Sequence, residues 1–179
     1  MISIPMLLVV SLALAPQDTV SPEYTQWSKH KPGTSVTMSM VSEVAGQKSE
    51  TVTKTTLKSV ADAELVLETT MTMMIADQKI EQPPMERKVP KMLPKVEVPK
   101  ETSTDPKPKI EEGQEELEIA GKKLKCKRMK TTTEVAGSTM VSTMWTTDDV
   151  PGGLVKMETS MSGAMESKTR GVVTAFELK

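Results

Sequence analysis

Methionine is the residue type in this sequence whose number and spacing most strongly suggest chemistry. The chain of 179 residues contains 15 methionines. Two pairs, Met38 with Met40 and Met71 with Met73, each place two thioethers two positions apart. Soft thioether ligands select Cu(I) over harder ions. Met38, Met40, Met71 and Met73 are therefore candidate ligands for Cu(I), in what would be a Met-rich periplasmic copper-binding protein.

Two other interpretations of the methionines are also open. Residues two positions apart lie on the same face of a strand, so the spacing is that of any inward-facing row. Methionine fills irregular cores, and aromatic side chains are only 2% of this sequence. A concave sheet lined by such adaptable side chains would also suit a lipid or acyl chain. Met157 and Met161 repeat the pattern at wider spacing.

The sequence contains few of the residue patterns that enzymes use for catalysis. His30 is the only histidine, so a zinc site built from several histidines is excluded, as is a chain of proton relays. Neither a G-x-S-x-G motif nor a glycine-rich phosphate loop occurs. The acidic pairs Glu111-Glu112, Glu115-Glu116 and Asp148-Asp149 lie in polar or turn contexts, where solvated carboxylates are expected. We predict no catalytic residue and no cofactor, and an enzyme using Asp148 and Asp149 is the weakest hypothesis.

The cysteine count and the net charge exclude an internal disulfide and make nucleic acid an unexpected partner. Cys126 is the only cysteine, which excludes an intramolecular disulfide. Its expected role is that of a small apolar residue in a strand. The net charge is −1, and no basic stripe with interleaved aromatic residues occurs, so nucleic acid is not an expected partner.

The elements that would position these side chains are mainly strands. From Ser35 onward apolar residues recur with a period of two, as in a β-meander with one apolar face. Leu65, Leu67, Met71, Met73 and Ile75 form the longest such series. Turns are predicted at four dipeptides: Ala45-Gly46, Asp62-Ala63, Ala120-Gly121 and Ala136-Gly137.

Two segments depart from the strand pattern. Ser21-Pro22-Glu23 has the residues of a helix start, and the helix is expected to carry Trp27 and to end near His30. The stretch 82–110 is rich in proline, lysine and glutamate, and is predicted to be an extended, exposed connection or to lie along a sheet edge.

The N-terminal segment has the pattern of an export signal. Residues 2–15 form a short apolar run that ends in Ala13-Leu14-Ala15, which resembles a cleavage site. The run is too short to span a bilayer comfortably. We predict a signal peptide at 1–15, a single β-rich domain at 16–179, no transmembrane segment after cleavage, and a periplasmic or secreted location.

Three short stretches carry a resemblance to known proteins. They are Lys31-Pro32-Gly33-Thr34, Gly121 to Cys126, and Trp145 to Lys156 with its Asp149-Val150-Pro151-Gly152-Gly153 loop. In their order along the chain they resemble uncharacterised exported bacterial proteins of planctomycete type. That layout is similar to the lipoprotein-carrier half-barrel family of the cell envelope. The resemblance implies a curved antiparallel sheet around an apolar cavity plugged by helix, and the carriage of acyl chains.

These observations predict a mainly β fold, a curved antiparallel sheet in the form of a half-barrel or roll, with one short N-terminal helix. The predicted function is non-catalytic binding of an apolar ligand. The residues expected on the ligand-binding face are Trp27, Met38, Met40, Leu65, Leu67, Met71, Met73, Trp145, Met157 and Met161.

Overall fold

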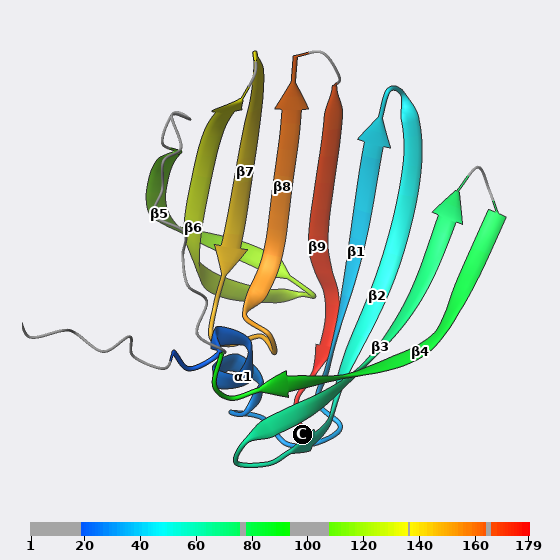
Figure 1. Ribbon diagram of the computed structural model, residues 1–179, viewed down its shortest axis with the longest axis vertical. Coiled ribbons are helices and arrows are strands. Elements are labelled where there is room, and N and C mark those ends of the chain that lie inside the picture. The colour runs from blue at the N-terminus through cyan, green and yellow to red at the C-terminus, as the bar shows by residue number, and fades with distance from the viewer. Residues whose placement is uncertain (1–18, 76–77, 94–107, 136, 164–165) are drawn as a thin grey trace, which may run out of the picture.

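The protein is a single curved sheet of nine antiparallel strands with one short helix (Figure 1). The structure is a computed structural model that describes residues 19–75, 78–93, 108–135, 137–163 and 166–179. Its elements are α1 (Pro22–Trp27), β1 (Ser35–Val44), β2 (Gln47–Val60), β3 (Glu64–Ile75), β4 (Gln78–Pro90), β5 (Lys109–Ile119), β6 (Lys122–Val135), β7 (Ser138–Thr146), β8 (Leu154–Ser162) and β9 (Ser167–Glu177). The predicted fold class is confirmed.

Two meanders meet at the centre of the sheet. The strand order is β4-β3-β2-β1-β9-β8-β7-β6-β5, so β1 to β4 form one half and β5 to β9 the other. The halves are joined by the pairing of β1 with β9, which brings Val36 opposite Phe176. The sheet is open, and β4 and β5 are its edges among the described strands.

The tight hairpins follow from local turn chemistry. Ala45 and Gly46 have φ values of 50° and 80°, and Ala120 and Gly121 have values of 50° and 74°. Two consecutive residues with positive φ are typical of the type I′ turns whose twist matches that of antiparallel strands. These two of the four predicted turns are therefore confirmed.

Helix α1 covers one end of the sheet. The Ser21 side chain accepts a hydrogen bond from the Tyr24 backbone N–H, and Pro22 occupies the first turn. The helix ends at Trp27, three residues before the predicted end. The His30 N–H bonds the Trp27 carbonyl, an i→i+3 contact that tightens the chain into a turn.

The hydrophobic core consists of two clusters that share partly buried Val36. One lies beneath α1 and comprises Tyr24, Trp27, Leu57, Leu65, Leu67 and Val89. The other comprises Ile119, Leu124, Cys126, Trp145, Val150, Val155 and Val173. In the second cluster the β5–β6 hairpin lies close to β9, and the Lys122 Nζ stands 4.5 Å from the centre of the Phe176 ring.

The proline-rich stretch begins as an edge strand. Residues 82–90 belong to β4, which pairs only with β3 among the described strands. Proline cannot donate a ladder hydrogen bond, so an edge is where such a sequence can pair. β5 begins at Lys109, within the stretch 82–110 that is predicted from the sequence to be a connection. Residues 94–107 and the predicted signal peptide lie outside the described residues.

Candidate functional site: the concave face of the sheet

The strand register assigns the side chains to the two faces of the sheet. Residues directly opposite each other in antiparallel strands share a face. One face carries Leu57 and Leu67, which pack with Trp27 of α1. We call this the concave face, because the sheet curves around the helix on this side (Figure 1).

A row of aligned positions crosses the concave face beyond the helix. From β4 to β6 the register places the following residues opposite one another: Ile80, Met73, Thr51, Met40, Gly171, Met157, Met144 and Met129. We call this set the methionine row. It spans eight strands, or about 34 Å at a strand spacing of ~4.8 Å. Residues from both halves of the chain contribute to it, so it exists only because β1 pairs with β9.

A second row, next to the first, is made of hydroxyl groups. It comprises Ser49, Ser42, Thr169, Thr159, Ser142 and Thr131 and is flanked by Ile75 and Ile110. Two cross-strand hydrogen bonds join its members, Ser42 Oγ to Thr169 Oγ1 at 3.1 Å and Ser142 Oγ to Thr159 Oγ1 at 3.2 Å. In each bond both partners are uncharged hydroxyl groups, so this part of the face is polar but neutral.

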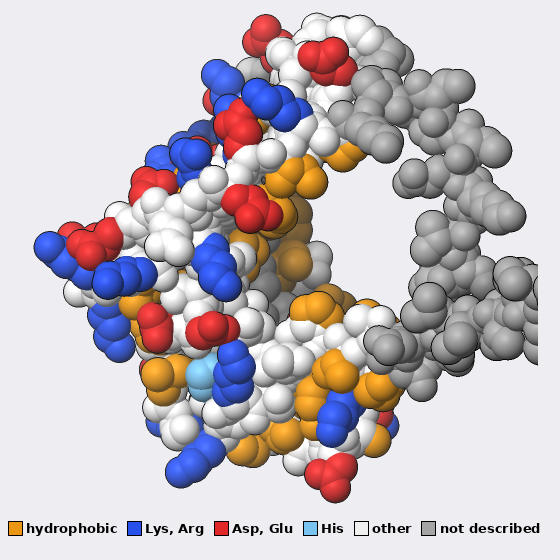
Figure 2. Space-filling model, turned by 90° about the vertical axis from the view of Figure 1, so that its left-hand side faces the viewer, with side chains coloured by type: hydrophobic (Ala, Val, Ile, Leu, Met, Phe, Trp, Pro, Cys, Tyr) orange, Lys and Arg blue, Asp and Glu red, His pale blue; other side chains and the backbone are white. Residues whose placement is uncertain are grey.

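On β1, β8 and β9, charged side chains lie on the opposite, outer face, whereas on the concave face Glu112 of β5 lies opposite Met129 at the end of the methionine row. Glu158 and Arg170 lie opposite each other on β8 and β9, one residue along from Met157 and Gly171, so their side chains point to the outer face. The two side chains form an ion pair at 3.6 Å. The members of the two rows carry no charge. Figure 2 shows hydrophobic side chains along the hollow of the molecule, and charged ones gathered on its outer side.

Exposed hydrophobic residues are concentrated on the concave face. Eight large apolar residues on strands of this face are strongly exposed: Val44, Val60, Ile75, Ile80, Met85, Ile110, Met129 and Met140. By register, Met74 is the exposed apolar strand residue that lies on the outer face. A single exposed apolar side chain is ordinary, but a contiguous set on one face indicates a surface that binds something.

The methionines come closest together over Gly171. A Cβ at Gly171 would lie 2.9 Å from Met157 Cγ, 3.5 Å from Met157 Sδ and 3.5 Å from Met38 Sδ. Met40 is directly opposite Gly171 on β1, and Met157 is opposite it on β8. Gly171 is buried. The missing side chain therefore gives thioethers from two non-adjacent strands a common space.

The structure divides the ten predicted ligand-binding residues into two groups. Six are half-buried methionines on the concave face: Met38, Met40, Met71, Met73, Met157 and Met161. The other four, Trp27, Leu65, Leu67 and Trp145, are buried in the two core clusters. The register places Trp145 opposite Lys156 and Arg128, which alternate with the methionine row and so belong to the outer face. The Trp145 Nε1 donates a hydrogen bond to the Glu115 carboxylate at 2.7 Å.

The predicted Cu(I) ligands fall into two pairs separated by β2. Thr53 stands between Met38 and Met71, and Thr51 between Met40 and Met73. Met129, Met140 and Met144 continue the same face on β6 and β7 but are not among the residues predicted from the sequence. The spacing of Met140 and Met144 fits a strand period, but only the register reveals that Met144 joins Met157.

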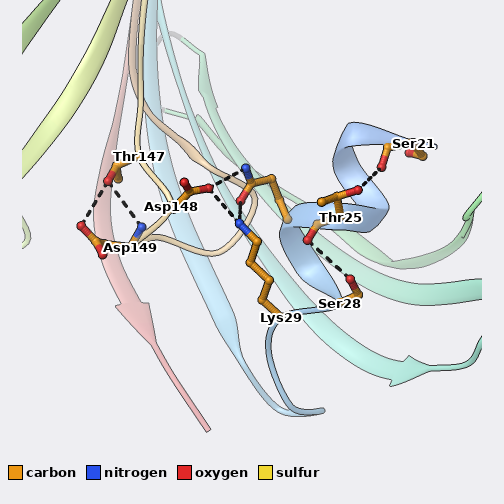
Figure 3. A network of polar contacts seen from close by, with 8 residues as sticks. Ser21, Thr25, Ser28, Lys29, Thr147, Asp148 and Asp149 are labelled. Atoms are coloured by element: carbon orange, nitrogen blue, oxygen red, sulfur yellow. Dashed lines mark hydrogen bonds and ion pairs between the residues drawn. The ribbon is translucent and has the colours of Figure 1, made fainter. Parts of the chain in front are cut away.

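Helix α1 is held at the lower end of this face by polar contacts on two sides. Lys29 Nζ and Gln26 Nε2 donate to Asp148 Oδ1 at 2.8 and 3.0 Å (Figure 3). On the other side, the Arg87 guanidinium of β4 forms two hydrogen bonds with the Glu23 carboxylate. These contacts fix the position of α1 between β4 and the loop that precedes β8.

Two members of the acidic pairs, Asp148 and Glu111, do not have the properties of a general acid. Hydrogen bonds from Lys29 and then Gln26, and the charge of Lys29, lower the pKa of Asp148. A hydrogen bond from Lys109, with the charges of Lys109 and Lys130, lowers the pKa of Glu111. A general acid near neutral pH needs a raised pKa, so both carboxylates instead serve as ion-pair partners.

The outer face also has a shallow depression of about 510 Å³. Its lining includes Glu158, Lys168 and Arg170, together with Val41 and Val141. Glu158 bonds both Lys156, at 3.0 Å, and Arg170, so its charge is already compensated. The concave face, with unpartnered apolar side chains, is the better candidate for a binding site.

Comparisons of the chain with protein-family models, with curated proteins and with solved structures find no match. Within the described residues, no helix has the length and hydrophobicity needed to cross a membrane.

Proposed function

We propose that this protein binds an extended apolar ligand, such as the acyl chain of a lipid, along its concave face. The observation that carries the proposal is the methionine row, an uncharged stripe that crosses eight strands and is not covered by α1. Each methylene of a ligand transferred from water to such a surface would contribute about 0.8 kcal/mol.

Three features of the face favour an acyl chain. The row is uncharged over eight strands, so an extended acyl chain lying along it would desolvate no charge. Methionine adapts its shape to chains of varied length and unsaturation. The adjacent hydroxyl row offers neutral donors and acceptors to the ester or carboxyl end of a lipid.

The proposal includes export from the cytoplasm. The apolar run at 2–15 with its Ala13-Leu14-Ala15 end supports it. The carrier half-barrel family, which the sequence layout resembles, binds acyl chains in the cell envelope, and the same activity is proposed for this chain. Expression in a bacterial host followed by fractionation and N-terminal sequencing tests the location. A cytoplasmic product with an intact N-terminus would contradict it.

A charge placed within the methionine row tests the binding proposal. Thr51 lies in the row, and its neighbour Val52 points to the outer face of the same strand. Thr51→Lys leaves every thioether in place but sets an ammonium group under the ligand, where desolvation opposes binding. We expect a fluorescent acyl ester, which has no charge that could pair with the lysine, to bind at least tenfold more weakly to Thr51→Lys, a change of ~1.4 kcal/mol.

Val52→Lys is the matched control and should bind like the wild type. Native mass spectrometry of protein purified from its host should also show a co-purifying lipid. Equal binding by both variants, or no binding by the wild type, would refute the proposal.

A further inference from the structure

We infer that Met38, Met40 and Met157 form a thioether site for Cu(I), centred over Gly171. The sulfur atoms of Met38 and Met157 both lie 3.5 Å from the position that a Cβ would take on Gly171. They come from β1 and β8, on either side of β9, and are therefore within reach of a common ion. This site shares Met40 and Met157 with the methionine row, but it does not require an acyl chain to be bound.

The third ligand follows from the register. Met40 is directly opposite Gly171, and Met38 is two residues away on the same face of β1. Met144 is opposite Met157 on β7 and stands next to the group. A cluster of three thioethers with a fourth nearby is thus assembled from three strands, while Met71 and Met73 lie beyond β2.

The surroundings select a soft monovalent ion. Thioethers prefer Cu(I), whereas Mg²⁺, Ca²⁺ and Mn²⁺ require oxygen ligands and Zn²⁺ prefers thiolate or imidazole. The residues opposite the cluster, such as Thr51 and Thr53, are neutral. Among the described residues there is no group of three or more His, Cys, Asp and Glu side chains that could hold a metal. Binding involves no electron transfer, because the ion is supplied and held as Cu(I).

Gly171 is the structural feature that makes the cluster possible. Its Cβ would lie 2.9 Å from Met157 Cγ, which is closer than real contacts allow, so an alanine would displace the Met157 side chain. The backbone of Gly171 does not have a positive φ, so alanine fits the strand. Gly171→Ala thus disturbs the sulfur geometry while it keeps all methionines and the apolar character of the face.

The test is an anaerobic titration of the purified full chain with Cu(I) against the competing chelator bicinchoninate. We expect one equivalent to bind with a dissociation constant below micromolar, and X-ray absorption to show sulfur neighbours. Met38→Leu with Met157→Leu keeps the side-chain volume but should weaken binding by at least roughly tenfold, because two soft ligands are lost. Gly171→Ala should weaken it as well.

Two variants serve as controls, and circular dichroism confirms that each variant folds. Met74→Leu removes a thioether from the outer face, and Cys126→Ser removes the buried thiol; both should bind Cu(I) like the wild type. Micromolar or weaker binding by the wild type would overturn the inference. The inference would also be overturned if Met74→Leu lost as much Cu(I) affinity as the double variant, or if Gly171→Ala bound Cu(I) like the wild type. A coordination shell of nitrogen and oxygen atoms in the X-ray absorption spectrum would do the same. Fatty-acid binding by Met38→Leu/Met157→Leu separates this site from the proposed acyl site, because leucine keeps the row apolar.

Discussion

The contact between α1 and the loop before β8 can be measured with two glycine variants that differ in one respect. Gly152 has a φ of 79° and Gly46 a φ of 80°, so alanine is strained equally at both. A Cβ on Gly152 would lie 3.2 Å from Trp27 Nε1 and 3.4 Å from Trp27 Cε2, whereas a Cβ on Gly46 meets nothing within 4 Å. The difference between the two variants therefore isolates the contact with Trp27.

The expected magnitudes follow from these distances. Gly46→Ala should cost about 1–2 kcal/mol, the usual penalty for a left-handed alanine. Gly152→Ala should cost about 1–3 kcal/mol more, the range for overpacking, because Trp27 is 3% exposed and has little room to retreat. For a chain of this size, each kcal/mol lowers the thermal midpoint by about 2–4 °C.

Urea and thermal unfolding followed by circular dichroism provide the measurement for both variants. Equal losses of stability in Gly152→Ala and Gly46→Ala would refute the packing of Trp27 against this loop. A larger loss in Gly46→Ala would refute the reasoning about the clash altogether.

Three other contacts lead to separate predictions. Cys126 is 2% exposed, and its burial, followed by the charges of Glu115 and Asp149, raises the pKa of its thiol. Iodoacetamide should therefore react far more slowly with the native protein than with the urea-unfolded protein. Equal rates would contradict the burial of Cys126. A double-mutant cycle of Glu23→Gln and Arg87→Gln, measured by urea unfolding, should give a coupling energy of about 0.2–1 kcal/mol, because the ion pair is half exposed. A coupling energy of zero would mean that this ion pair does not hold α1 in place. Burial and then the charge of Lys29 lower the pKa of His30, so the unfolded chain binds that proton more readily. The free energy of unfolding should fall as the pH drops below about 6.5, and His30→Gln should reduce this dependence; an unchanged slope would assign it to other groups.

The features that the sequence predicted correctly depend on local interactions. The Ser21 cap and the Ala45-Gly46 and Ala120-Gly121 turns are set by residues a few positions apart. The alternation from Leu65 to Ile75 depends on the two-residue period of a strand, and the register places these residues on one face. Such signals do not depend on the rest of the fold.

The methionine row could not be predicted, because it depends on pairings between distant segments. Gly171 meets Met40 only after β9 pairs with β1, more than a hundred residues away along the chain. The two-residue period puts Trp145 on the face opposite to Met144, but only the register shows that Met157 lies on the same face as Met144. The assignment of Trp145 to a core cluster, where Lys156 Nζ lies 4.3 Å from its ring centre, follows from the register and a bulge after Trp145.

The start of β5 was missed because its pairing is electrostatic rather than apolar. Glu111 is opposite Lys130 on β6, with 3.8 Å between the two charged groups, and Glu116 is opposite Lys125. Opposite charges on facing positions stabilise a strand pair without any hydrophobic period. A search for alternating apolar residues therefore detects only the part of β5 that contains Leu117 and Ile119.

The two edges of the sheet give a further reason to place binding on the concave face. An exposed edge can pair with a strand of another chain unless proline or charge prevents it. β4 contains Pro83 and Pro84, which lack the N–H that a new ladder would need. β5 carries five glutamates in eleven residues, so a strand from a second copy would meet like charges in an antiparallel arrangement. Both edges thus resist strand addition, whereas the methionine row is neutral, apolar and half exposed. A ligand that binds this protein without a large rearrangement would therefore gain most from contact with the concave face.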